Sequence, residues 1–318
     1  MRKFKILLIL LFIIILAACS NTGNEDLYIP EITRIEGREG DALIWKVSSN
    51  TATVYLVGTI HVGLESLYPM QQVLLDAFYR SDVLAVEIDT IAIERSLQTQ
   101  IRMAEMMILE DGSTIEAHVS SETFELFQKF IENKSLLEQQ VLSSLRVGFA
   151  AMTLMQMQLE EWGFMDVPGV DHFFLEIAHE IGKEILEVES MEYQLGIIIG
   201  FSKALQELQL REILETPEEE SRELMEKMLN MWINGDAEAL RYLLETADNE
   251  FRQTNATLFI EYNTAMMLNR DIAMTESIIE MLSGNQTVFF AVGAAHIIGE
   301  NGIIEQLENA GWTVTRVE

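Results

Sequence analysis

Two copies of one short pattern, Gly-x-x-His, lie near opposite ends of this chain, and each directly follows an apolar run. The first segment, residues 53–61, ends in His61, and the second, residues 287–296, ends in His296. Both apolar runs are rich in β-branched and aromatic residues, which indicates buried strands. In an open α/β sheet, ligands bind beyond the carboxyl ends of the strands. The sequence therefore places two histidines where chemistry is usually done, and the two could meet in space.

The rest of the pattern predicts an α/β fold with a mainly parallel central sheet. A hairpin is expected at residues 42–57, because a short polar turn separates two apolar segments. A helix near 73–78 and a strand at 83–89 follow, and strand-helix-strand is the unit of a parallel sheet. The later expected elements are a helix at 170–178, a strand at 184–190, a helix at 302–307 and a strand at 312–317. These sheet elements flank a largely helical middle, at about residues 91–282.

The N-terminus resembles the export signal of a bacterial lipoprotein. Basic residues precede an apolar run, residues 6–16, that is short for a membrane span, and a lipobox-like sequence ends in Cys19. Cys19 is the only cysteine, so lipidation explains it better than redox chemistry does. We expect residues 1–18 to be removed and Cys19 to carry the lipid in the cell envelope, outside the cytoplasm. The alternative is an uncleaved N-terminal anchor helix.

Charge limits the partners of the mature chain. The formal net charge is −30, and it becomes −33 when residues 1–18 and their three basic residues are removed. Nucleic acid is therefore an unfavourable partner. The same charge repels anionic lipid, so the membrane contact is expected through the N-terminal lipid only. After Cys19 and a polar tether, residues 19–40, we expect residues 41–318 to form a single α/β domain with the helical middle as an insertion.

A carboxylate completes a candidate metal site with the two histidines. Glu87 follows four apolar residues at the end of the next expected strand, where a carboxylate is costly without a role. Two imidazoles and one carboxylate are a common ligand set for a divalent metal that keeps positions open for water and substrate. Such a metal can lower the pKa of bound water to about 7. The alternative for Glu87 is a salt bridge to a basic residue such as Arg270.

Two further residues are candidates for an assisting catalytic role. Glu189 is the analogous carboxylate on the following strand, with Gln194 shortly after it, and either side chain could orient the metal ligands or bind substrate. The alternative for Glu189 is helix capping. Arg270, a charged residue in an apolar helical stretch, could polarise a carbonyl or phosphoryl oxygen. The alternative for Arg270 is a position on a solvated helix face.

The remaining sequence patterns do not indicate catalytic or metal-binding residues. The methionine-rich stretch at residues 152–157 is expected to fill the core, as methionines at this spacing usually do. His118, His172 and His179 lack the strand-end position and are expected to be structural or surface residues. The chain contains no His-Glu-x-x-His, Gly-x-Ser-x-Gly, Walker or Gly-x-Gly-x-x-Gly motif, so the common zincin, α/β-hydrolase and nucleotide-binding assignments have no support.

Taken together, these motifs resemble the TraB/GumN family, which includes the Tiki metalloproteases and belongs to a wider group with erythromycin esterase-like and ChaN-like haem-binding proteins. The resemblance implies a metal-dependent peptidase centre formed by His61, Glu87 and His296. Arg270 matches a family arginine that is commonly followed by Asn, whereas Asp271 follows it here. The matching segments extend over most of the mature chain and are residues 57–63, 86–89, 169–171, 189–190 with Gln194, 269–271, and 291–296 with Gly299 and Gly302.

Three functions remain open at this point. The first is a lipid-anchored extracytoplasmic metal-dependent hydrolase, a peptidase by resemblance, that uses Zn²⁺, Mn²⁺ or Co²⁺ and acts on a peptide or small-molecule substrate. In it Glu189 and Arg270 assist the metal ligands. The alternative is a non-catalytic binding lipoprotein that takes up haem, metal or a peptide in the same cleft without turnover. The third is an inactive structural partner in the envelope.

Overall fold

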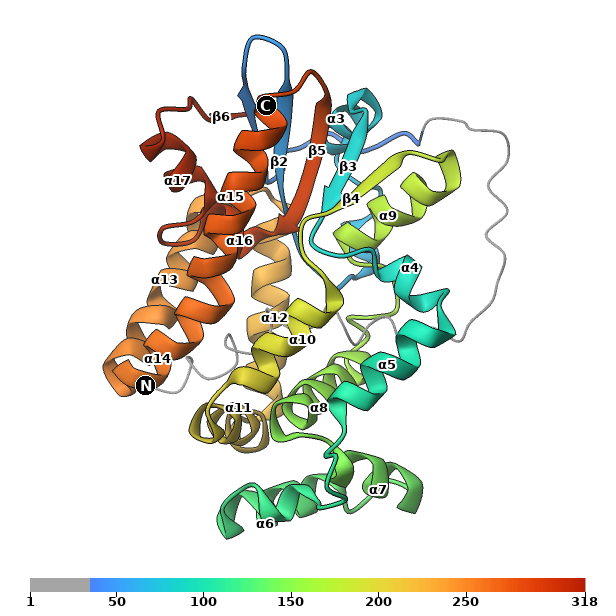
Figure 1. Ribbon diagram of the computed structural model, residues 1–318, viewed down its shortest axis with the longest axis vertical. Coiled ribbons are helices and arrows are strands. Elements are labelled where there is room, and N and C mark those ends of the chain that lie inside the picture. Colours follow the sequence, from blue (N-terminus) through green and yellow to red (C-terminus); the bar gives the residue numbers. More distant parts are fainter. Residues whose placement is uncertain (1–34, 318) are drawn as a thin grey trace.

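The computed structural model describes residues 35–317. The expected signal, Cys19 and most of the tether lie outside the described residues. Six strands form one sheet in the order β4-β3-β5-β2-β1-β6, with helices around it (Figure 1). The strands are β1 (Ile44–Ser48), β2 (Thr53–Thr59), β3 (Val83–Val86), β4 (Glu184–Glu187), β5 (Thr287–Gly293) and β6 (Thr315–Arg316).

The predicted mainly parallel sheet is confirmed. Strands β4, β3, β5 and β2 run parallel, and β1 joins β2 as the predicted antiparallel hairpin. The last strand, β6, is shorter than expected and pairs antiparallel with β1 at the sheet edge. Strand β5 lies between β2 and β3, so the three strands that precede His61, Glu87 and His296 are neighbours. Chain order conceals this arrangement, because β5 comes near the end of the sequence.

The predicted helical middle is also confirmed, with β4 as its one strand among the described residues. Short 3₁₀ turns occupy Glu65–Leu67 and Ile115–Ala117, and a π-helical segment, η3, spans Thr264–Leu268. Within residues 35–317, no helix combines the length and hydropathy needed to span a bilayer. The α-helices are α3 (Gln72–Arg80), α4 (Thr90–Glu94), α5 (Leu97–Met107), α6 (Ser121–Ile131), α7 (Leu136–Ser144), α8 (Val147–Glu161), α9 (Val170–Ile181), α10 (Met191–Gly200), α11 (Lys203–Glu215), α12 (Glu218–Ile233), α13 (Ala237–Thr254), α14 (Ala256–Asn263), α15 (Asn269–Leu282), α16 (Ala294–Ile298) and α17 (Ile303–Asn309).

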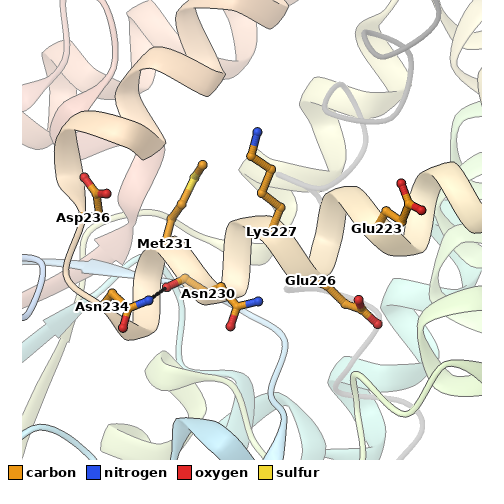
Figure 2. A pocket seen from close by; sticks show the side chains of 7 residues that line it. All are labelled: Glu223, Glu226, Lys227, Asn230, Met231, Asn234 and Asp236. Atoms are coloured by element: carbon orange, nitrogen blue, oxygen red, sulfur yellow. Dashed lines mark hydrogen bonds between the residues drawn. The ribbon is translucent and has the colours of Figure 1, made fainter.

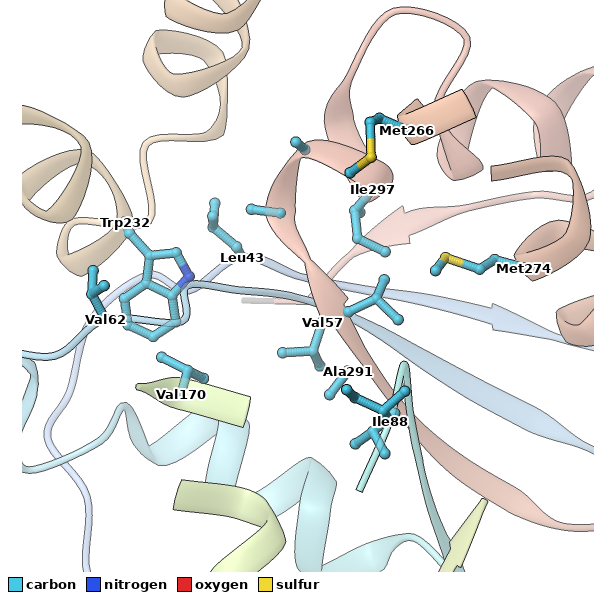
Figure 3. Packing of buried hydrophobic residues seen from close by; sticks show 14 of the residues in the cluster. Leu43, Val57, Val62, Ile88, Val170, Trp232, Met266, Met274, Ala291 and Ile297 are labelled. Carbon is cyan, nitrogen blue, oxygen red and sulfur yellow. The ribbon is translucent and has the colours of Figure 1, made fainter. Parts of the chain in front are cut away.

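Helices pack on the sheet through large apolar side chains. Phe289 of β5 contacts Phe78 of α3 and Phe174 of α9, with ring centroids 5.5 and 4.7 Å away. Close to the end of β2, Trp232 of α12 is buried beside Val62 and Val170 (Figure 3), and its indole N–H donates to the carbonyl oxygen of Gly58 at 2.7 Å. This bond connects α12 to the first Gly-x-x-His segment.

The methionine-rich stretch fills the core, as the sequence predicts. It lies on α8, where Met152 and Met155 are buried among aliphatic and aromatic side chains. Helix α8 packs mainly against α11 rather than against the sheet. Methionine suits such a helix-helix contact because its flexible side chain fills irregular gaps.

Candidate functional site

The carboxyl ends of β2, β5 and β3 bring the predicted metal ligands together. A methyl group placed on Gly293, the last residue of β5, would lie 3.3 Å from Nε2 of His61, 3.5 Å from Oε1 of Glu87 and 3.6 Å from Cδ2 of His296. The register explains this convergence, because Thr59 of β2 is paired with Gly293 across the parallel ladder. Only a residue without a Cβ leaves this space open.

His61 is held by Asp171, in the first turn of α9. Its Nδ1 atom lies 2.8 Å from Oδ1 of Asp171. The helix reaches this position because Gly169 packs against the backbone of His61, where a Cβ would lie 2.4 Å from the carbonyl carbon. The amide of Val170 also donates to the carbonyl oxygen of Ile60 at 2.9 Å. With Nδ1 occupied by the carboxylate, the Nε2 edge of His61 faces Gly293.

His296 has a matching partner on another helix. Its Nδ1 atom lies 2.5 Å from Oδ1 of Asp271, and both side chains are buried. Asp271 lies in the first turn of α15, directly after the π-helical segment η3. Single π-helical turns within helices are frequent at functional sites. Here the segment precedes two consecutive charged residues, Arg270 and Asp271, that are both buried against the site.

A buried ionic network holds the third predicted ligand. Oε2 of Glu87 accepts hydrogen bonds from Arg270 at 2.6 Å and from Gln194 at 3.0 Å, and its Oε1 accepts from the amide of Gly293 at 2.9 Å. Arg270 also donates to both carboxylate oxygens of Glu189, at 2.7 and 2.8 Å. The salt bridge considered for Glu87 therefore exists. The solvated helix face considered for Arg270 is wrong, because that side chain is 3% exposed.

Electrostatics at the site favour an ionised Glu87, whereas burial raises the pKa of Asp271. Burial alone would raise the pKa of Glu87, but Arg270 and the two histidines outweigh burial and hold that pKa well below its usual range. Burial likewise would lower the pKa of His61, but Asp171 and Glu87 outweigh it and raise the pKa. Glu87 is therefore a carboxylate at neutral pH, and the neighbouring carboxylates favour the charged form of His61.

The donor types at this site fit a divalent metal in part. Histidine ligands usually have their second nitrogen bonded to a carboxylate or carbonyl, which is how Asp171 and Asp271 hold His61 and His296. Oε1 of Glu87 carries the Gly293 amide and has a second lone pair. Across residues 35–317, however, no group of three or more His, Cys, Asp or Glu side chains stands in metal-binding geometry. The pairing of Glu87 with Arg270 also reduces the negative charge that Glu87 offers to a cation.

Asp171 and Asp271 are the histidine partners to which the sequence analysis assigned no role. Both belong to segments that carry the family resemblance, but neither received a role. The available signal was their position, since each is an acidic residue in the first turn of a helix that buries one apolar face. Their histidine partners lie far away in sequence and on other elements, so spacing could not identify the pairs.

The remaining histidines make separate contacts that suit structural roles. Nε2 of His179 lies 2.7 Å from Asp89, which caps α4, and Nε2 of His118 lies 2.7 Å from Oγ of Ser113. His172 lies 3.5 Å from Glu176 on the same helix. None of these contacts includes His61, Glu87 or His296.

The sequence matches the model of the TraB/PrgY/gumN family over residues 43–316. The chain belongs to this family. This confirms the resemblance, and the match spans the whole described sheet from β1 into β6. The family segment contains all three predicted metal ligands and both of their aspartate partners.

Two relatives match most of this chain at low identity. Each is an uncharacterized protein YbaP, one from Escherichia coli (strain K12) and one from Shigella flexneri, and each is 23% identical over 253 residues. The alignment covers 80% of this chain and 87% of each relative. No solved structure matches significantly. These relatives carry no stated activity, so the functional argument depends on the site itself.

A separate pocket of about 400 Å³ lies along α12 (Figure 2). It contains none of the site residues, and its lining is largely acidic and amide side chains with one lysine. Nothing in it selects a ligand. The lining residues are Glu223, Glu226, Lys227, Asn230, Met231, Asn234 and Asp236.

Proposed function

We propose that this chain is a lipid-anchored extracytoplasmic metal-dependent hydrolase that cleaves peptide bonds, with residues 41–318 as its domain. His61, Glu87 and His296 hold the metal, which is Zn²⁺, Mn²⁺ or Co²⁺. The observation that carries the proposal is the pair of aspartate-held imidazoles that face one point beside Gly293. A histidine that only stabilises the fold does not require a second histidine, held by its own aspartate, beside the same glycine.

The chemistry of the proposal divides between the metal and the protein. When bound, a divalent metal supplies a water molecule of lowered pKa and polarises a carbonyl oxygen. The aspartates keep the proton on Nδ1 of each histidine and leave Nε2 as the atom with a lone pair. Nε2 of His61 lies beside Gly293, where His296 presents its Cδ2 edge. Glu87 supplies negative charge, and its ionisation is secured by Arg270.

Glu189 and Arg270 act on the metal ligands rather than on the substrate in this proposal. Each assigned donor bond of Arg270 goes to Glu87, to Glu189 or to the carbonyl oxygen of Met266. An arginine committed in this way fixes the orientation of Glu87. Substrate polarisation by Arg270 would require breaking one of these buried ion pairs, which is costly.

The first experiment measures bound metal. The purified chain is reconstituted with Zn²⁺, Mn²⁺ and Co²⁺ in turn, and the metal content is determined by mass spectrometry beside the His61→Ala/His296→Ala double variant. We expect near-stoichiometric metal in the parent chain and its loss in the double variant. His118→Ala is the matched control, because it removes a histidine outside the site, and it should retain the metal.

Turnover separates the proposal from the binding alternative. A peptide library should be cleaved by the metal-loaded chain and not by the double variant, and chelators should stop the cleavage. Stoichiometric haem uptake with a Soret shift and no cleavage would instead establish the non-catalytic binding lipoprotein. Metal-free chains with undiminished cleavage would contradict the metal-dependent mechanism.

The lipid anchor has its own test. Metabolic labelling with a palmitate analogue should mark the parent chain and not Cys19→Ser. The reason is the sequence of residues 1–19, in which a basic start, an apolar run and a lipobox-like end occur in the order of a lipoprotein signal. Equal labelling of both chains would remove the anchor from the proposal without affecting the metal site.

A further inference from the structure

Thr59, the last residue of β2, carries a buried hydroxyl that makes no hydrogen bond within residues 35–317. The residue is 2% exposed, and its Oγ1 atom has no partner there. Most buried polar groups in folded proteins have a hydrogen-bond partner, because burial without one costs free energy. Valine has nearly the same shape and would avoid this cost. The hydroxyl of Thr59 therefore points to a partner outside the described chain.

The side chain of Thr59 lies on the face of the sheet that carries the candidate site. Thr59 is paired with Gly293 in the parallel ladder between β2 and β5. Side chains of paired residues on neighbouring strands lie on the same face, with the strands about 5 Å apart. On this face, a methyl group on Gly293 would contact His61, Glu87 and His296. The hydroxyl of Thr59 is therefore next to the space that these side chains surround.

The sheet face beneath Thr59 is apolar. Val57 and Ala291, two residues earlier on the two strands, form the preceding pair on this face, and both are buried (Figure 3). Packing alone would be served by a further apolar side chain at the next position. The hydroxyl instead appears where the apolar strand reaches the site, which favours a role toward a molecule bound there.

The other hydrogen-bond donors that surround this space already have acceptors. The Nδ1 atoms of both histidines face their aspartates. The amide of Gly293 donates to Glu87. Arg270 and Gln194 donate to the carboxylates of the ionic network. The hydroxyl of Thr59 is thus a donor beside the site that has no acceptor among the described residues.

We propose that the hydroxyl of Thr59 donates a hydrogen bond to the carbonyl oxygen of the peptide bond that the site cleaves. This inference rests on the proposed function. The carbonyl oxygen gains negative charge during hydrolysis, and a donor held at that point stabilises the transition state more than the ground state. Glu87 and Nε2 of His61 present acceptors and cannot supply this bond. Thr59 is therefore a catalytic residue that touches the substrate, and it is not a metal ligand.

The first test removes the donor and keeps the shape. In the metal-loaded chain, Thr59→Val should retain the metal content of the parent and lose about 100-fold in kcat on a cleaved peptide. Thr59→Ser, which restores a hydroxyl, should recover at least about tenfold of that loss. Thr216→Val is the matched control, because Thr216 is a buried threonine outside the site whose hydroxyl donates to the carbonyl oxygen of Glu212. It should keep the kcat of the parent.

A second test needs no turnover. Acetohydroxamate, whose carbonyl oxygen stands in for that of the peptide, is titrated into the Co²⁺-loaded chain and followed by visible absorption. Thr59→Val should bind it about tenfold more weakly than the parent and Thr216→Val do. The melting temperature of Thr59→Val should equal or exceed that of the parent, since the change removes a buried hydroxyl that has no protein partner.

Other outcomes overturn the proposal. A role in stability alone would lower the melting temperature of Thr59→Val and leave acetohydroxamate binding unchanged. Loss of metal from Thr59→Val would assign the hydroxyl to the metal site instead of the substrate. Metal retained in a parent chain that cleaves no peptide leaves the acetohydroxamate titration to decide.

Failure of the proposed function can be told apart from failure of this contact. If the parent chain binds no metal, metal-dependent hydrolysis is excluded, and the contact is tested by peptide binding alone. A library of hexapeptides with capped ends is passed over the immobilised metal-free chain, and the retained peptides are measured by mass spectrometry. Weaker retention by Thr59→Val than by the parent and Thr216→Val would support the carbonyl contact. Equal retention by all three chains, or none, would overturn it.

Discussion

Nδ1 of His296 lies 2.5 Å from Oδ1 of Asp271, with both side chains 2% exposed. A carboxylate here keeps the proton on Nδ1 and leaves the Nε2 lone pair for a metal. Asp271→Asn introduces an amide that can donate to Nδ1 and so favour the opposite tautomer. We expect metal affinity to fall about 10- to 100-fold, as for other buried partners of histidine ligands. Metal titration with a competing chelator measures this change.

Asp166→Asn is the matched control for that change, because Asp166 is exposed and outside the site. It should leave metal affinity unaltered. Unchanged affinity in a folded Asp271→Asn chain would remove Asp271 from the site and leave His296 without an orienting partner.

The second prediction concerns the space beside Gly293. Its φ is −49°, which alanine adopts freely, but the added methyl would lie 3.3 Å from Nε2 of His61. Gly293→Ala should therefore fold, with a free energy of unfolding within about 1 kcal/mol of the parent, and bind metal at least about tenfold more weakly. Circular dichroism and metal titration on one sample test both statements.

Gly196→Ala is a suitable control, since nothing lies near the methyl that it adds on α10. It should keep both stability and metal affinity. Full metal affinity in Gly293→Ala would mean that the ligand site is not beside this glycine.

The sheet was predictable from sequence because its central strands are short apolar runs bounded by polar turns. Residues 53–57 and 287–292 show this pattern plainly, and their glycine-histidine ends locate the site. The parallel pairing of β2 with β5 was not visible in the sequence, because strand order depends on packing between distant segments. The sequence consequently identified His61 and His296 without showing that they converge.

Local patterns were least informative where the chemistry depends on several elements at once. The sequence offered a salt bridge between Arg270 and Glu87 as an alternative, and the structure contains it. It did not indicate that Arg270 also pairs with Glu189 from a third segment. The π-helical segment before it has no recognisable sequence signature, since Thr264–Leu268 are ordinary helix-compatible residues. Tertiary contacts decide such features.

The third prediction tests the buried ion pairs of Arg270. Replacing it by methionine leaves Glu87 and Glu189 as uncompensated buried charges. Arg270→Met should therefore lower the free energy of unfolding by about 3–5 kcal/mol. Denaturant unfolding measures this loss. Arg241→Met is the control, because Arg241 pairs with Glu245 on the exposed surface of one helix, and it should cost less than about 1 kcal/mol.

A smaller loss for Arg270→Met, equal to that of the control, would mean that the two carboxylates find other partners. Arg270→Met should also reduce metal affinity, because Arg270 fixes the orientation of Glu87. Stability and affinity are expected to fall together for Arg270 and to stay unchanged together for Arg241.

The fourth prediction concerns pH and a carboxyl group on α13. Burial, with Glu300 and Glu245 close by and Arg252 opposing them, raises the pKa of Asp248 on α13 to about 6. The folded state thus holds this proton more tightly than the unfolded state does, so the contribution of Asp248 to stability is present at acid pH and is lost as the pH rises through 6. Asp248→Asn, which stays neutral, should be more stable than the parent by about 1–2 kcal/mol at about pH 7.5. The advantage should vanish near about pH 4, where Asp248 is protonated in the folded state. Thermal unfolding at both pH values measures the difference, and an advantage of equal size at both would show that the charge of Asp248 is not its cause.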